Sequence, residues 1–257
     1  MDPTDVAWAE AHAALQSLVD RARRRSSVAL PLEFVKGGSD TPLARLLGGG
    51  RSGEVRLKLF LTYVMRATRK PYETRQFHSS EAARALALPD PDGKGARRIQ
   101  AATRWLKNAG FLAEKGDRRS LPQVQILDPR RVPHPLVLKP WPGRGEGKRY
   151  LSLPIELWSN GWICVLSGRA LALYLVLNEL TTSRSNRGWT DRYRRELYGL
   201  SDATWARAAG ELKEMGLLTI TKKSVKDDSA VERERNIYEL HQERLKTFTP
   251  RTIPRQG

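Results

Sequence analysis

Cysteine and histidine are scarce in this chain, whose 257 residues include one cysteine and four histidines. The single Cys164 excludes an internal disulfide and any metal site built from several cysteines. It lies in the apolar stretch 162–166, so we expect it in the core and not as a nucleophile. The histidines are scattered and form no zinc motif. We therefore expect a protein that is not an enzyme and that has no metal or cofactor site.

Long hydrophobic stretches are missing as well. No apolar run approaches the ~20 residues that a membrane-spanning helix needs, and the N-terminal segment lacks the apolar part of a signal peptide. Glycines recur at 48–53 and 143–148, but neither segment has the complete P-loop pattern that binds phosphates. These absences favour a globular, cytoplasmic protein with no membrane partner and no evident small-molecule substrate.

Acidic residues are too few to balance the basic ones. Lysine and arginine number 45 against 28 aspartates and glutamates, which gives a net charge of +17. Residues 51–128 carry 16 basic and 8 acidic side chains and residues 129–149 carry 6 and 1, whereas residues 150–245 carry 14 and 13. A GC-rich genome would explain arginine over lysine, but not basic over acidic. Such an excess repels itself unless a polyanion neutralises it, which favours a nucleic-acid partner.

The chain does contain an internal repeat, because three short segments return in the same order. The pairs are LPLEF at 30–34 and LPIEL at 153–157, LKLFL at 57–61 and LALYL at 171–175, and LKNAGFL at 106–112 and LKEMGLL at 212–218. The last pair reads as a helix that ends at a glycine and leads into a strand. We therefore expect two copies of one module.

The expected organisation is mainly α with small β-hairpins, an α+β class. An N-terminal helix occupies 1–27, with Thr4 or Asp5 as its cap, and runs to about Arg25. It could pack on the first module or pair with a second copy of the chain. The remaining segments are a first module at 28–128, a stiff basic linker rich in proline and glycine at 129–149, a second module at 150–245 and a disordered tail at 246–257.

Each module is expected to hold three helices and a hairpin. In the first module the expected elements are a strand at 28–35, a loop at 37–53, helices at 56–68, 79–88 (capped by Ser79 or Ser80) and 96–109 (ended by Gly110), a turn-rich insert at 89–95, and strands at 111–114 and 123–127. In the second they are a strand from Tyr150, helices at 168–180 (capped by Ser167), 191–198 and 202–215, a polar loop at 181–188, and strands at 217–221 and 236–240.

The third helix of each module has the pattern of a helix that enters a major groove, with one apolar face and one polar face. The expected buried residues are Ile99, Ala102 and Leu106 in the first module, and Trp205, Ala208 and Leu212 in the second. In the first module the expected DNA contacts are Lys94 in the insert, Arg97, Arg98, Gln100 and Arg104 on the third helix, and Arg118 and Arg119 in the following turn. In the second module they are Thr204 and Arg207 on the third helix, and Lys222 and Lys223 in the hairpin that follows. Arginine can read guanine and glutamine can read adenine, while the turn residues would meet phosphates or the minor groove.

These features resemble the winged helix-turn-helix superfamily over roughly 28–128 and 150–245. The match is best at 201–220, where a capped helix, the segment LKEMGLL and a hairpin follow one another. The first copy departs from the pattern at 89–95, where a tight turn is usual. Two copies that each open with an L-P-x-E strand resemble plasmid and phage replication initiators with tandem winged helices. This resemblance implies sequence-specific binding of double-stranded DNA at the nucleoid, in replication initiation or transcription regulation.

Other interpretations stay open at this point. An amphipathic helix also exposes arginine where it only faces solvent. The near-neutral second module, with Glu211 and Glu214 on its third helix, suits dimerisation or a protein-interaction scaffold in a replication or partition complex. The basic linker, with Trp141 for base stacking, suits RNA or single-stranded DNA.

Overall fold

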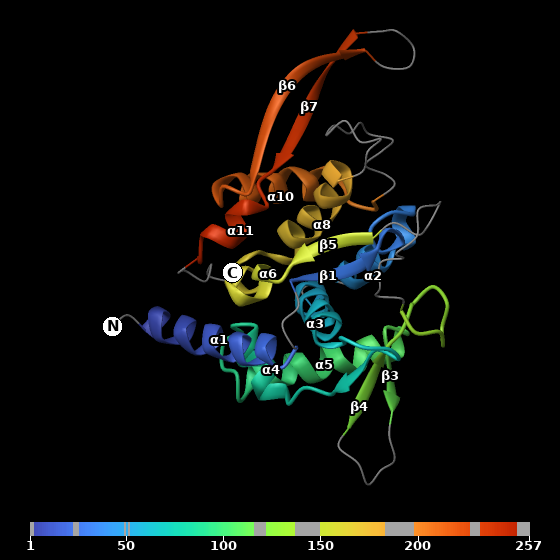
Figure 1. Ribbon diagram of the computed structural model, residues 1–257, viewed down its shortest axis with the longest axis vertical. Coiled ribbons are helices and arrows are strands. Elements are labelled where there is room, and N and C mark those ends of the chain that lie inside the picture. Colours follow the sequence, from blue (N-terminus) through green and yellow to red (C-terminus); the bar gives the residue numbers. More distant parts are fainter. Residues whose placement is uncertain are drawn as a thin grey trace.

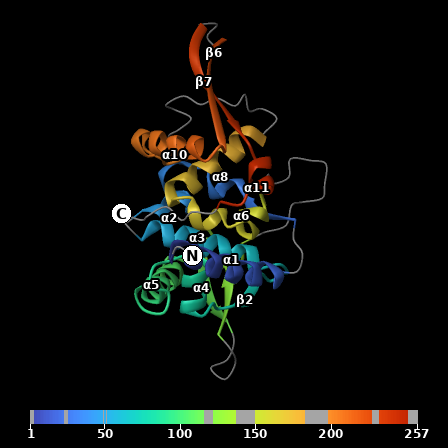
Figure 2. The same ribbon diagram turned by 90° about the vertical axis from the view of Figure 1, so that its left-hand side faces the viewer.

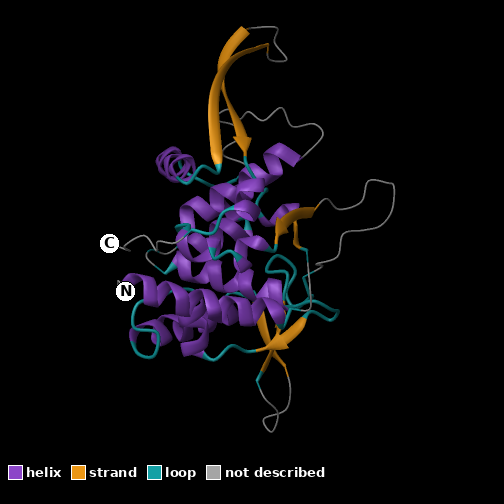
Figure 3. Ribbon diagram, turned by 60° about the vertical axis from the view of Figure 1, so that its left-hand side comes forward, coloured by secondary structure: helices purple, strands orange, loops and turns teal. Residues whose placement is uncertain are grey.

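The structure is a computed structural model that describes residues 3–22, 26–48, 50, 52–115, 122–136, 150–182, 198–226 and 232–250. It is mixed α/β, with helices and small antiparallel sheets. The molecule is elongated, and a β-hairpin projects from each end of its long axis (Figure 1). Helices fill the body, while the strands lie at its two ends and along one side (Figure 3). We call residues 3–136 the first half and residues 150–250 the second half.

The first half confirms the three helices expected in the first module. Its elements are α1 (Pro3–Asp20), β1 (Ser27–Pro31), the 3-10 helices η1 (Leu32–Phe34) and η2 (Gly38–Asp40), α2 (Pro42–Leu47), α3 (Gly53–Arg66), β2 (Glu73–Arg75), α4 (Ser79–Ala85), α5 (Lys94–Asn108), β3 (Leu112–Lys115) and β4 (Gln123–Ile126). The N-cap of α4 is His78, one residue before the expected Ser79 or Ser80. Strand β2 was not expected; it pairs with β4, so that the sheet has the order β2-β4-β3.

The prediction of a loop at 37–53 was wrong, because the stretch contains α2. Thr41 caps this helix, since its Oγ1 accepts a hydrogen bond from the Ala44 N–H at 3.2 Å, and Pro42 occupies the first turn. Leu43 and Leu46 of α2 are fully buried. A Thr-Pro start is a known helix signal. The prediction missed it because the helix is short and glycines precede and follow it, which is the pattern of a loop.

The second half has more helices than expected. Its described elements are β5 (Tyr150–Pro154), α6 (Glu156–Ser159), α7 (Trp162–Val165), α8 (Gly168–Thr182), α10 (Asp202–Glu214), β6 (Leu218–Lys226), β7 (Glu232–Leu240) and α11 (Glu243–Thr247). The short helices α6 and α7 were not expected. The cap of α8 is confirmed, because Ser167 Oγ accepts a hydrogen bond from the Ala170 N–H at 3.2 Å. Of the expected helix at 191–198, only Tyr198 is described. Of the expected loop at 181–188, only residues 181 and 182 are described.

The tail was expected to be disordered from residue 246, and this was wrong as far as residue 250. Lys246 and Thr247 end α11, and the chain then packs on the body. Trp162 Nε1 donates hydrogen bonds to the carbonyl oxygens of Leu245, at 3.2 Å, and Phe248, at 3.0 Å. The tryptophan, which is itself fully buried, therefore holds this segment in place.

The linker begins later than the expected residue 129. Residues 128–136 form a compact turn in which Arg130 donates two hydrogen bonds to the Asp128 carboxylate, at 3.0 and 2.9 Å. The Leu136 N–H then donates to the Ile126 carbonyl at 3.0 Å. Residues 137–149, which include Trp141, lie outside the described part of the chain.

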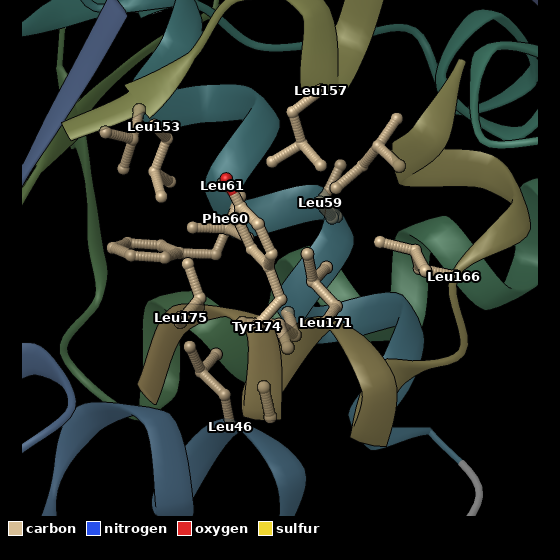
Figure 4. Close-up of a cluster of buried hydrophobic side chains, with 14 of the residues drawn as sticks. Leu46, Leu59, Phe60, Leu61, Leu153, Leu157, Leu166, Leu171, Tyr174 and Leu175 are labelled. Atoms are coloured by element: carbon tan, nitrogen blue, oxygen red, sulfur yellow. The ribbon is translucent and has the colours of Figure 1, made fainter. Parts of the chain in front are cut away.

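The two halves share one sheet and one core. Strands β1 and β5 pair antiparallel from Ser27↔Pro154 to Pro31↔Tyr150. Helix α3 lies in the middle of the body, and Leu59, Phe60 and Leu61 gather with Leu171, Tyr174 and Leu175 of α8 in one buried cluster (Figure 4). The repeated segments 57–61 and 171–175 therefore meet each other, and the repeated segments 30–34 and 153–157 begin in the two strands that pair. One continuous core stabilises both halves together.

Helix α1 packs on its own chain and touches both halves. It ends at Asp20, before the expected end at Arg25, and residues 23–25 lie outside the described part. Arg21 forms an ion pair with Glu81 of α4 at 2.9 Å. On the other side, the His12 ring nitrogen lies 2.8 Å from the Ser159 carbonyl oxygen of α6. Figure 2 shows α1 across the lower part of the body, beside α4.

Candidate nucleic-acid interface

Helix α5 presents the expected basic residues on its outer face. Ile99, Ala102 and Leu106 are at most 3% exposed and hold the helix on the core. All five predicted contacts on this helix are exposed, namely Lys94, Arg97, Arg98, Gln100 and Arg104. The apolar period that predicted the buried stripe thus also places these side chains together on one surface.

The insert at 89–95 fixes the start of α5. The Asp90 carboxylate accepts a hydrogen bond from the Lys94 N–H at 2.7 Å, and the Asp90 carbonyl accepts one from the Gly95 N–H at 2.8 Å. Arg84 of α4 contacts the carboxylate of Asp92 at 3.0 Å. The seven residues that depart from a tight turn therefore form a capped connection, which sets the direction in which α5 leaves α4.

The end of α5 is fixed by Gly110 and Arg45. Gly110 has a φ of +76°, and a Cβ at this position would lie 2.6 Å from a methyl carbon of Val132. Arg45 donates a hydrogen bond from one guanidinium nitrogen to the Ala109 carbonyl at 2.9 Å and from the other to the Pro129 carbonyl at 3.1 Å. Arg45 is thus a basic residue that serves the fold, since it closes the C-terminus of the helix.

The charges on α5 are all of one sign. Its ionisable residues are Lys94, Arg97, Arg98, Arg104 and Lys107. Lys107 is engaged, because it contacts Glu114 of β3 and donates to Gln76 at 2.9 Å. The exposed part of the helix carries Lys94 and three arginines, the side chains suited to phosphates and guanine edges.

An ion pair beneath α5 connects the two halves. Lys58 of α3 is 1% exposed; it contacts Glu54 at 2.7 Å and donates to the Cys164 carbonyl at 3.0 Å. Glu54 in turn accepts a hydrogen bond from the Gly168 N–H, at the start of α8, at 2.9 Å. Burial opposes ionisation of Glu54, but Lys58, the Gly168 N–H and the charge of Arg98 outweigh it and hold its pKa below the usual value.

Helix α10 of the second half has the same scaffold with a different surface. Ser201 caps it by accepting a hydrogen bond from the Thr204 N–H at 3.2 Å, and Trp205, Ala208 and Leu212 are buried as expected. Arg207 is exposed, whereas Thr204 is half-buried and its hydroxyl lies 2.9 Å from that of Ser201. The Glu211 carboxylate accepts hydrogen bonds from the Ser167 N–H, at 2.7 Å, and the Ser167 hydroxyl. Like Glu54, it therefore neutralises the N-terminus of α8.

The two hairpins hold the other predicted contacts. Arg118 and Arg119 lie between β3 and β4, at positions outside the described residues. Strands β6 and β7 are nine residues each, longer than expected. Lys222 and Lys223 of β6 are both exposed, and Lys222 forms an ion pair with Glu234 at 3.1 Å. Arg235, which sequence reasoning did not select, lies directly opposite Lys223.

Cys164 is buried, as expected. Its thiol lies 3.2 Å from the Ala85 carbonyl oxygen, and burial raises its pKa to about 12. A thiol with so high a pKa remains protonated at neutral pH, which makes it a poor nucleophile.

A cleft of about 260 Å³ lies beside the end of the β1–β5 sheet. Its charged and aromatic lining residues are Glu33, Asp128, Arg130, Arg131, His134 and Tyr150. Burial opposes ionisation of Asp128, but its hydrogen bonds with Arg130 outweigh this and lower its pKa. Asp128 and Arg130 thus satisfy each other within the wall of the cleft.

Across the described ranges, no group of histidine, cysteine and carboxylate side chains is arranged to hold a metal ion. None of the helices in these ranges is both long and apolar enough to cross a bilayer. Comparisons with protein-family models, with curated proteins and with solved structures find no match to this chain.

Proposed function

We propose that this protein binds double-stranded DNA with sequence preference through the exposed face of α5, as a tandem winged helix-turn-helix protein. The observation that carries the proposal is the charge of this face: Lys94, Arg97, Arg98 and Arg104 are exposed on one helix that bears no acidic residue. The apolar face of the same helix is buried in the core, so the basic face is available to a groove.

The order of elements supports the winged-helix part of the proposal. Helix α3, strand β2, helices α4 and α5, and the hairpin β3–β4 follow one another, and the sheet has the order β2-β4-β3. In the second half, α8, α10 and the hairpin β6–β7 come in the corresponding order. The resemblance found in the sequence therefore agrees with the arrangement of the described elements.

A salt titration tests DNA binding directly. Fluorescence anisotropy with a random-sequence duplex should give an affinity that falls steeply with salt, because every phosphate contact releases counterions. On the sequence that the protein prefers, the triple variant Arg97→Ala, Arg98→Ala and Arg104→Ala should lose about 100-fold or more in affinity, at roughly 1–3 kcal/mol for each base-reading arginine. Lys246→Ala is the matched control, because this exposed lysine of α11 is paired with Glu243 and is not on the proposed surface. Equal affinities for the triple variant and this control would refute the proposal.

We propose that the protein acts as a replication initiator or a transcription regulator and that it forms a homodimer. Mapping the preferred sites separates these roles. Short direct repeats beside the gene would indicate an initiator, and a single inverted repeat over its promoter would indicate a repressor.

A protein-interaction scaffold is the second candidate, and one observation favours it. Helix α10 carries Asp202, Glu211 and Glu214 against Arg207 and Lys213, so it is slightly acidic. A pure scaffold would bind no duplex in the same titration. Preference for single-stranded over duplex DNA would instead point to the undescribed basic segment around Trp141.

A further inference from the structure

The cleft beside the β1–β5 sheet lies where the two halves of the chain meet. Its walls come from the end of β1 and from η1, from the start of β5, and from the turn at 128–136. The volume of about 260 Å³ is slightly below the ~300–1,000 Å³ of typical small-molecule sites. The cleft therefore has room for one small molecule. The lining residues that matter for its chemistry are Glu33, Arg131, His134 and Tyr150.

The charged groups of the lining fall into two sets. Asp128 and Arg130 offset each other, because the Arg130 guanidinium donates two hydrogen bonds to the Asp128 carboxylate. Within the described ranges, by contrast, the side chains of Glu33, Arg131 and His134 make no hydrogen bond or ion pair. Two basic groups and one carboxylate are therefore available to a ligand.

Two tyrosines add an aromatic wall and a buried hydroxyl. Tyr150 is half-buried, and burial, the nearby Tyr72 and the charge of Glu33 raise the pKa of its hydroxyl. Tyr72 is 3% exposed, and in the described part of the chain its hydroxyl has no hydrogen-bond partner. Its φ of +62° lies in the left-handed region, which bulky residues rarely adopt. Unsatisfied buried groups and strained backbone both concentrate at functional sites.

The turn at 128–136 holds the two basic groups in a fixed arrangement. The Arg131 N–H donates to the Asp128 carbonyl at 2.9 Å, and the His134 N–H donates to the Arg131 carbonyl at 2.7 Å. Little backbone order is therefore left to be gained when an anion binds to these side chains. A site that is formed in advance binds more tightly than one that the ligand must order.

These groups together fit a nucleoside monophosphate. Arg131 and His134 suit its phosphate, because both side chains donate hydrogen bonds to anionic oxygens. The ring of Tyr150 suits its base, since every base stacks on an aromatic side chain. Glu33 can accept a hydrogen bond from an N–H group of the same base. Inorganic phosphate would use only the basic groups and would leave the carboxylate without a partner.

We propose that this cleft binds a nucleoside monophosphate, with its phosphate on Arg131 and His134 and its base against Tyr150 and Glu33. The binding site itself does not depend on the proposed DNA binding. It gives the protein a small-molecule ligand in addition to its nucleic-acid partner.

The turn that holds the basic groups also touches the end of α5. Arg45 donates one hydrogen bond to the Pro129 carbonyl of the turn and another to the Ala109 carbonyl after the helix. Gly110 lies against Val132 of the same turn. A ligand on the turn should therefore change the affinity of α5 for DNA, and DNA should change the affinity for the ligand by the same factor. This coupling, unlike the site, rests on the proposed function.

Calorimetric titration of the full chain tests the site. The probes are the four ribonucleoside monophosphates, the matching nucleosides without phosphate, and inorganic phosphate. At least one monophosphate should bind. Its nucleoside and inorganic phosphate should each bind about tenfold more weakly or less, because each lacks one set of contacts.

Variants of the lining separate the contacts. The double variant Arg131→Ala, His134→Ala should lose about tenfold or more in affinity for the nucleotide. Glu33→Ala should weaken the nucleotide but not inorganic phosphate, and Tyr150→Leu should weaken it about tenfold while Tyr150→Phe, which keeps the ring, should not. Arg207→Ala is the matched control, because this exposed arginine of α10 does not line the cleft. Thermal melting checks that each variant is folded.

The site is refuted if no monophosphate binds at concentrations up to about 1 mM, or if the double variant binds as tightly as the control. Equal affinities for inorganic phosphate and the nucleotides would also refute it, since the cleft would then hold only an anion.

Fluorescence anisotropy with and without saturating nucleotide tests the coupling. The affinity for the preferred duplex should change by about fivefold or more, and the double variant should show no such change. An unchanged affinity would refute the coupling. Binding of the nucleotide by a protein that binds no duplex would refute the proposed function and leave the site intact, so the two proposals are tested separately.

Discussion

Helices α5 and α10 have the same construction and opposite electrostatic character. At the start of each, a side-chain oxygen accepts a hydrogen bond from a helix N–H, from Asp90 in α5 and from the N-cap Ser201 in α10. Each also has a buried apolar stripe and a glycine of positive φ after its end, +76° at Gly110 and +70° at Gly216. Yet α5 carries only basic residues, whereas α10 carries three acidic residues and two basic ones. The repeat therefore preserves what folding requires, and the two copies differ on the surface that a ligand would meet.

The halves differ in charge but are joined through a common centre. Glu54 from α3 and Glu211 from α10 both accept hydrogen bonds at the start of α8. A change at this point should affect the stability of both halves, whereas changes on the two helix surfaces should affect binding unequally.

The largest effect on stability is expected from Lys58→Ala. It removes the partner of Glu54 and the donor to the Cys164 carbonyl, and breaking a buried ion pair costs about 3 kcal/mol or more. Urea unfolding followed by circular dichroism should show the whole chain unfolding at lower urea in one transition. The double variant Lys58→Met, Glu54→Gln should lose less, because it leaves no unpaired charge. Two separate transitions in the wild-type protein would contradict the shared core.

The next largest effect compares one arginine from each helix. Arg98→Ala should lower affinity for the preferred sequence about tenfold and relax the base preference, as expected when a base contact worth about 1–3 kcal/mol is lost. Arg207→Ala should cost about threefold or less, because acidic neighbours already offset its charge. Selection from a random duplex library, repeated for each variant, measures both quantities. An equal loss for the two variants would mean that the helices share the reading of DNA.

A smaller effect is expected from the two helix caps. Asp90→Ala and Ser201→Ala should each destabilise the protein by about 1 kcal/mol, because each removes an acceptor for an N–H group at a helix start. Only Asp90→Ala should also weaken DNA binding, since it loosens the start of α5. Thermal melting and anisotropy on the same samples check this difference.

The smallest effect concerns pH. The pKa of Glu54 is lowered in the folded state, so its ionised form contributes stability above the unfolded pKa near 4.5. That contribution is lost as the pH falls through the lower, folded-state pKa. Unfolding free energies measured between neutral pH and the acid range should therefore decline less steeply for Glu54→Gln than for the wild-type protein. Parallel curves would show that Glu54 is not the titrating group.

The elements of strong local signal were predictable from the sequence. Helix α5 has an apolar stripe at helical spacing and a glycine after its end, and α10 has these features together with Ser201 as its cap. Both helices and their buried stripes were therefore predicted correctly, but Thr204 of α10, expected to face outward, is half-buried. The exposed residues of α5 were predictable from the same helical spacing, because the residues between the apolar positions must face outward.

What was missed depends on contacts between distant residues. The pairing of Leu30 with Leu151 in the β1–β5 sheet leaves no local trace, so the halves were expected to be separate modules. A buried lysine such as Lys58 is equally hidden, because lysine is usually exposed. The β6–β7 hairpin was predicted too short because lysine and glutamate have low strand propensity. Arg235 was overlooked for the same reason, since its position opposite Lys223 follows only from the register.

The antiparallel pairing of β1 with β5 has the local symmetry of a contact between two identical strands around a two-fold axis. In a symmetric dimer each substitution would occur twice, once in every subunit. A covalent fusion removes that constraint, because either half can then change alone while the common interior stays intact. The divergence of α5 and α10 is what such freedom allows, because one chain can keep a shared centre while its two outer helices differ in charge.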